Sequence, residues 1–116
     1  MRNRDNVADL AAHFRREFPQ RVRLRRLPRL RNFGTTLKQK DGSFVIKLRS
    51  TLCEGGQIGF LIHEWSHVVS WDLDTHHSEH GPMFGLAYSE VWQSYLRWAG
   101  WLEAKAASLP AKLQDR

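Results

Sequence analysis

Apolar residues recur at every third or fourth position in three stretches of the chain, and this spacing predicts helices. The first helix is expected from about Asn6 to Phe18, with Asp5 as its N-terminal cap and Pro19 directly after its end. The second is expected within residues 56–71, where the apolar residues are frequent enough for the helix to be buried. Both helices therefore carry an apolar face that can pack against a core.

The third helix is expected to start at Pro82, because proline is favoured at the first position of a helix. It reaches about Trp101, and a short helical extension continues to Pro110. Residues 103–116 are expected to be a loosely packed tail.

Apolar and polar residues alternate in three segments between the first two helices, which predicts three short strands. The strands cover residues 21–28, 35–39 and 44–50, and residues 32–34 are expected to form a turn. Asp41-Gly42 between the second and third segments is typical of a hairpin. The order of elements predicts an α+β fold: an N-terminal helix, a small, mostly antiparallel three-stranded sheet, and two further helices.

The whole chain, residues 1–116, is expected to form a single domain with one hydrophobic core. No apolar run is as long as a membrane span, and no signal-peptide core follows Met1, so a cytoplasmic location is expected, in the host cytoplasm if a phage encodes the chain. The single Cys53 excludes an internal disulfide and a four-cysteine zinc ribbon, and it is expected to be a small buried residue.

The positive charge is concentrated in the first half of the chain. Residues 1–52 contain 14 Lys and Arg against 4 Asp and Glu, whereas residues 53–116 contain 4 against 8. Much of the excess lies in the first predicted strand, which would bury one face and present arginines on the other. The functional interpretation is a phosphate-binding surface for DNA or RNA, and the alternative is a solvated face without a partner. The arginines in question are Arg21, Arg23, Arg25 and Arg26.

The second predicted helix contains the sequence His63-Glu64-Trp65-Ser66-His67. Histidines four positions apart lie on one helical face, so both imidazoles can bind the same metal ion. Glu64 can then accept a proton from a water on that metal. This spacing predicts a zinc site with His63 and His67 as ligands and Glu64 as general base.

A catalytic zinc usually has three protein ligands and one position open to water. His80 is the preferred third ligand, because Gly81 and Pro82 hold it at the junction before the last helix. His76, His77 and Glu90 remain alternatives. Three further residues have weaker roles to consider. Asp72 and Asp74 could orient a ligand, although a solvated turn is the preferred interpretation for them. Tyr88 could stabilise an oxyanion, although core packing is the preferred interpretation for it.

With these residues, the sequence resembles the SprT-like zinc metallopeptidases, a His-Glu-x-x-His group of zincin type. The resemblance covers roughly residues 44–95: the motif, a loop of about a dozen residues, then His-Gly-x-x-aromatic at the start of a helix. The His-Gly-Pro segment is similar to that of small phage and actinobacterial members that lack a C-terminal zinc ribbon. It implies a zincin-like core, zinc on His63, His67 and His80, Glu64 as general base, and Phe44–Ser50 as the edge strand that binds an extended peptide.

Two functions from different classes follow. The first is a zinc-dependent metallopeptidase that hydrolyses peptide bonds, or else another amide such as a cell-wall linkage. The second is a nucleic-acid-binding protein with a structural zinc site. The two functions can coexist, in which case DNA recruits the protease to its substrate. The sequence leaves the physiological substrate and the oligomeric state open.

Overall fold

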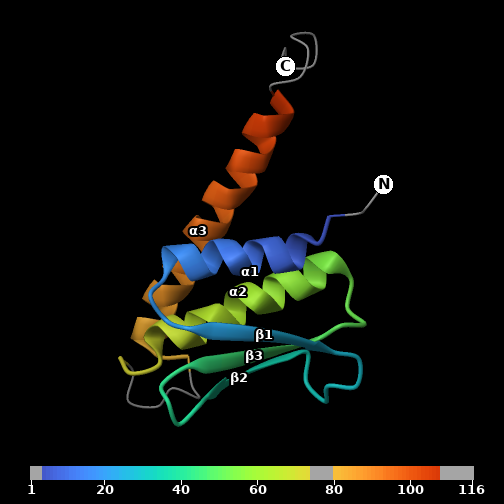
Figure 1. Cartoon of the computed structure of the whole chain (residues 1–116). Helices are drawn as coiled ribbons and strands as arrows, with labels where there is room; N and C mark the ends of the chain where they lie inside the picture. The colour runs from blue at the N-terminus through green and yellow to red at the C-terminus, as the bar shows by residue number, and fades with distance from the viewer. Residues whose placement is uncertain (1–3, 74–79, 108–116) are drawn as a thin grey trace.

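The computed structural model describes residues 4–73 and 80–107, with side chains up to residue 100. Three helices and three strands follow one another as α1 (Asn6–Glu17), β1 (Val22–Leu27), β2 (Gly34–Lys38), β3 (Phe44–Arg49), α2 (Glu54–Ser70) and α3 (Pro82–Ala107). The helices α1 and α2 lie on one side of the sheet, and the C-terminal half of α3 extends away from the other elements (Figure 1). The α+β class is confirmed.

The helices agree with the spacing of apolar residues, except at the end of the last one. Asp5 caps α1, since its side chain accepts a hydrogen bond from the backbone N–H of Ala8 at 3.1 Å. The third helix continues unbroken to Ala107 and does not end near Trp101. The predicted helical extension is thus present as far as Ala107, and residues 108–116 of the predicted tail lie outside the described residues. Of the described helices, none has both the length and the apolar character needed to cross a bilayer.

The prediction for the sheet was wrong in two respects. The strand order is β1–β3–β2, with β3 parallel to β1 and antiparallel to β2, so the sheet is mixed and not mostly antiparallel. The segment expected at the edge, Phe44–Ser50, forms the central strand β3. The physical reason is burial: Phe44, Val45, Ile46 and Leu48 are all buried, which requires neighbours on both sides. The two edges are β1 and β2 (Figure 1).

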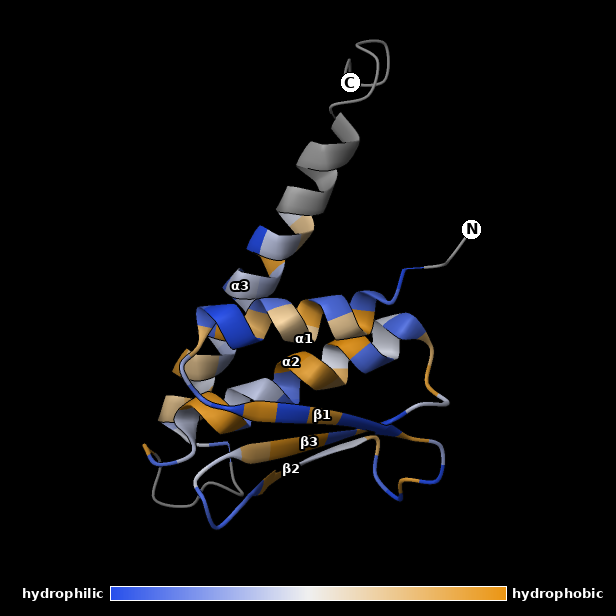
Figure 2. Cartoon of the chain, in the orientation of Figure 1, coloured by the Kyte–Doolittle hydropathy of each residue, from blue (hydrophilic) through white to orange (hydrophobic). Residues whose placement is uncertain are grey.

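The core lies between the sheet and the helices. Figure 2 shows hydrophobic segments along α2 that alternate with polar ones, and this helix buries Leu61, Ile62 and Trp65 completely. The Trp65 ring packs on Phe14 of α1 with 5.2 Å between ring centroids, and Ile46 of β3 closes the cluster from the sheet side. Full burial of such side chains stabilises a fold by about 1.5–3 kcal/mol each. The helix α2 is therefore held firmly in place.

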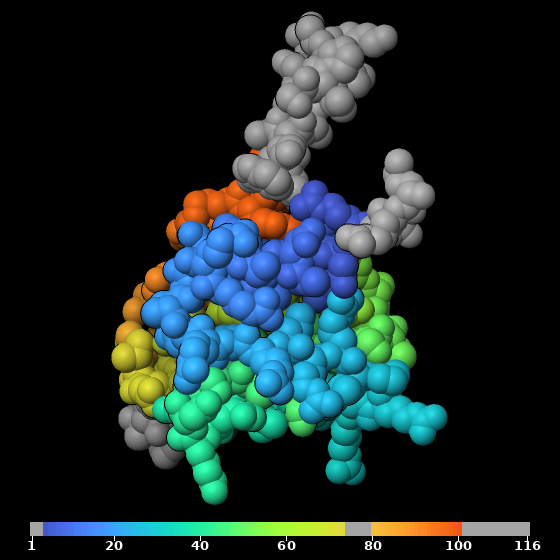
Figure 3. Space-filling view, viewed as in Figure 1, coloured from blue at the N-terminus to red at the C-terminus, as the bar shows by residue number. Residues whose placement is uncertain are grey.

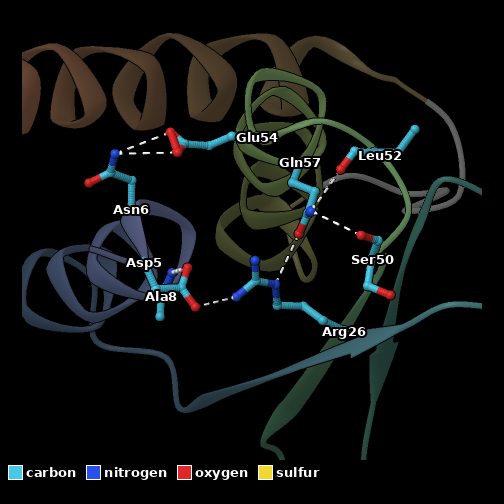
Figure 4. A network of polar contacts seen from close by, with 8 residues as sticks. All are labelled: Asp5, Asn6, Ala8, Arg26, Ser50, Leu52, Glu54 and Gln57. Atoms are coloured by element: carbon cyan, nitrogen blue, oxygen red, sulfur yellow. Dashed lines mark hydrogen bonds and ion pairs between the residues drawn. The ribbon is translucent and has the colours of Figure 1, made fainter. Parts of the chain in front are cut away.

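A polar network connects the first turns of α1 and α2 with β1 (Figure 4). Arg26 of β1 donates to Asp5 at 2.6 Å and to the side-chain oxygen of the buried Gln57 at 2.9 Å. The Gln57 amide in turn donates to the backbone oxygen of Leu52 at 2.9 Å. Arg26 thus points toward the helices and holds the elements together, in contrast to the arginines at odd positions of the strand.

We expect Asp5→Ala to lower the free energy of unfolding by about 1–2 kcal/mol at pH 7, because it removes a helix cap and the partner of Arg26. Asp5→Asn keeps a capping oxygen and should lose less. The pKa of Asp5 is lowered, first by the Ala8 N–H, against the opposing effect of partial burial, and then by Arg26.

The charge of Asp5 therefore stabilises the fold fully above its ordinary pKa of 3.8, and this contribution is lost as the pH falls through the lower folded-state value. Urea unfolding at pH 7 and at pH 3 checks this expectation. The difference between wild type and Asp5→Asn should shrink at pH 3, and a constant difference would contradict it.

Candidate metal centre

Two of the predicted ligands come from one face of α2. His63 and His67 are one turn apart, and their ring centroids are 5.0 Å from each other. Both side chains are half-buried, since the neighbouring positions of α2 are packed into the core. The helix that forms the core thus also fixes the direction of these two imidazoles.

The third predicted ligand, His80, precedes α3 and reaches the same point. Its ring centroid lies 4.8 Å from that of His63 and 5.2 Å from that of His67. One possible ligand atom from each of the three histidines lies within 4.8 Å of the others. His63, His67 and His80 therefore lie close enough to bind one metal ion.

The donor set fits zinc. Zinc binds histidine nitrogens at about 2.0–2.1 Å, so two such nitrogens in a tetrahedral site are about 3.4 Å apart. The possible ligand atoms of the three histidines all lie within 4.8 Å of one another, which is compatible with a single ion between them. Three ligands also leave the fourth tetrahedral position open, as catalytic zinc sites do.

Phe84 of α3 supports the three imidazoles from one side. Its ring centroid lies 5.3 Å from that of His63, 4.6 Å from that of His67 and 4.4 Å from that of His80, on which it stacks. Phe84 is itself buried. This side chain packs α3 against α2 beside the three imidazoles and covers them on that side.

Glu64 lies next to the histidines but faces the sheet. Its side chain is buried, and its Oε1 accepts a hydrogen bond of 2.7 Å from the hydroxyl of Thr36 on β2. Burial raises the pKa of Glu64, while the Thr36 hydrogen bond and the charge of His80 act in the opposite direction. A carboxyl group with a raised pKa accepts a proton more readily than an ordinary one, so Glu64 can serve as a base.

The electrostatic surroundings of His63 also favour its metal-binding form. Burial, and secondarily the charge of His80, lower the pKa of His63. The neutral imidazole is the form that binds metals. The site therefore holds His63 in the protonation state that a ligand needs.

The structure places Glu90 and Asp72 apart from this group. Glu90 lies with Glu17 and Arg97 beside a different hollow and is not part of the histidine cluster. Asp72 lies exposed in the turn after α2, as expected, and pairs there with Lys38 at 3.3 Å. His76, His77, Asp74 and Glu79 lie outside the described residues.

Two residues expected in the core are at the surface. Tyr88 is 40% exposed and stacks on Phe84, so core packing does not describe it. Cys53 is exposed, and its sulfur caps α2 by accepting from the N–H of Gly56. The cap gives this cysteine a role at a helix end, where an acceptor is needed.

Thr36 and Gly34 of β2 are the residues at the site that the sequence did not reveal. Gly34 was expected in a turn, yet it begins β2, and a Cβ atom there would lie 3.3 Å from Cγ of Glu64. Strand alternation places both residues on one face, but no local signal indicates that this face meets Glu64.

The chain matches no protein-family model, no curated protein and no solved structure.

Proposed function

We propose that this chain is a zinc-dependent metallopeptidase of the His-Glu-x-x-His type, with a zincin-like core and a relationship to the SprT-like group. One observation carries the proposal: three histidines surround one point, and a buried glutamate lies beside them against an edge strand. In this proposal the histidines bind the metal ion, and the glutamate is the group that accepts and returns a proton.

A structural zinc explains this arrangement less well. Closed structural sites have four protein ligands, commonly including cysteine. Among the described residues the cluster holds three histidines, and Cys53 caps a helix instead. A three-ligand site with an acid beside it supports the enzyme over the structural interpretation.

The substrate would be an extended peptide that adds as a strand to β2. The resemblance assigned this role to Phe44–Ser50, but that segment is the central strand and its backbone is already paired on both sides. Strand addition needs an unpaired edge, and β2 is the edge that contacts Glu64 through Thr36. A peptide along β2 would pass beside the three histidines.

In the proposed reaction, Glu64 accepts a proton from a water molecule while the water oxygen attacks the carbonyl carbon of the scissile bond. The C–N bond then breaks, and Glu64 gives the proton to the departing amine nitrogen. Zinc held by His63, His67 and His80 supplies Lewis acidity, which lowers the pKa of water and polarises the carbonyl. Phe84 keeps bulk water from one side of the reacting groups.

Glu64→Gln tests this function. We expect the variant to keep its zinc and to lose at least about a hundredfold in the rate of casein cleavage, because the amide cannot accept the proton. Hydrolysis of fluorescein-labelled casein and zinc content are measured on the same preparations. Full activity in Glu64→Gln would refute the mechanism. Glu54→Gln is the matched control, since Glu54 lies at the far end of α2.

Nucleic-acid binding is a second candidate function, supported by the open face of the sheet. Arg23 and Arg25 are exposed on β1, and Lys47 of β3 lies next to Arg25 in the sheet register. Figure 3 shows β1 at the surface of the molecule. Arg26, which was grouped with them, points the other way and is bound to Asp5 and Gln57. The surface proposed to contact phosphates is therefore Arg21, Arg23, Arg25 and Lys47.

The salt dependence of binding to a labelled DNA duplex tests this second function. Each phosphate contact contributes about 0.9 to the slope of log K against log salt. We expect Arg23→Ala/Arg25→Ala to reduce the slope by about two, and Arg4→Ala/Arg16→Ala, with the same change in charge, to leave it unchanged. Equal slopes in the two double variants would exclude this face as the binding surface.

A further inference from the structure

The edge strand β2 contacts Glu64 through two residues of its inner face. Gly34 and Thr36 are two positions apart and lie opposite Leu48 and Ile46 of β3, both of which are fully buried. Side chains at alternate positions point to the same side of a sheet. Both residues therefore face α2, while the outer edge of the strand remains unpaired among the described residues.

The contact between Thr36 and Glu64 is short and specific. The hydroxyl oxygen of Thr36 lies 2.7 Å from Oε1 of Glu64 and 3.2 Å from the backbone oxygen of the same residue. A hydroxyl has one proton to donate, and the shorter contact to a carboxylate is the stronger hydrogen bond. In the described part of the chain, Thr36 supplies the only side-chain hydrogen bond to this carboxylate.

We infer that Thr36 is a positioning residue for the general base: its hydroxyl fixes Oε1 of Glu64 and leaves Oε2 free to accept the proton from water. This inference rests on the proposed peptidase function. A glutamate side chain has several rotatable bonds, so without this bond its carboxylate could take other rotamers. Small displacements of a catalytic group cost up to about a hundredfold in rate.

Gly34 completes the arrangement by leaving room for the Glu64 side chain. A Cβ atom at this position would lie 3.2 Å from Cδ2 of Leu48, 3.3 Å from Cγ of Glu64 and 3.4 Å from Cβ of Phe60. Such contacts are tight on three sides, so a larger residue would displace Glu64 or the strand. The same strand thus orients the base and offers its edge to the peptide.

A matched pair of variants tests the role of the hydroxyl. Thr36→Val keeps the shape and the β-branched side chain but removes the donor, whereas Thr36→Ser keeps the donor. We expect Thr36→Val to lose about ten- to a hundredfold in kcat on labelled casein, with KM and zinc content unchanged. Thr36→Ser should stay within about threefold of wild type, because the hydrogen bond is retained.

Equal kcat in Thr36→Val and wild type would overturn the inference, as would equal losses in the valine and serine variants. Crystal structures of both variants supply a readout that needs no activity. Glu64 should keep one carboxylate position in Thr36→Ser and leave it in Thr36→Val, and an unmoved carboxylate in Thr36→Val would also overturn the inference. If wild type cleaves no casein, the proposed function fails on this probe, while the crystal structures still decide the role of Thr36.

Discussion

The packing of α2 between the sheet and α3 is the interaction on which the rest of the structure depends. Leu61, Ile62 and Trp65 bury one part of its circumference completely. Successive residues of a helix are separated by about 100° around its axis, so residues 63 and 64 point in different directions. His63 and its partner one turn later face the start of α3, while Glu64 faces β2. One buried helix therefore directs both the ligands and the base.

This arrangement places polar groups where water is scarce, and each needs a partner there. A buried polar group without a hydrogen bond or ligand costs about 1–3 kcal/mol on the scale of protein variants. Thr36 supplies that partner for the Glu64 carboxylate. His63 and His67 are half-buried on the neighbouring face of α2, and with the exposed His80 they surround one point backed by Phe84. The packing that fixes the base therefore also fixes two of the three candidate ligands.

Sequence patterns predicted the features that depend on local spacing. The extent of α1, its Asp5 cap, the Asp41-Gly42 hairpin and the approach of the three histidines all follow from residues near one another in the chain or at a helix junction. The strand order does not, because pairing joins distant segments. A sign that β3 is central was present, however: Phe44, Val45 and Ile46 are apolar in succession, which favours a strand with a neighbouring strand on each side. The hydrogen bond between Thr36 and Glu64 joins residues 28 positions apart, so no local pattern of the sequence indicates it.

The measurement that tests the metal centre most directly is the zinc content of wild type and of His80→Ala, with His13→Ala as a control, after dialysis against zinc and removal of weakly bound ions. His13 lies on α1 and bonds Ser94, away from the cluster. The account predicts about one zinc per chain in wild type and in His13→Ala, and a marked loss in His80→Ala. Wild type without zinc, or His80→Ala with its full complement, would contradict it.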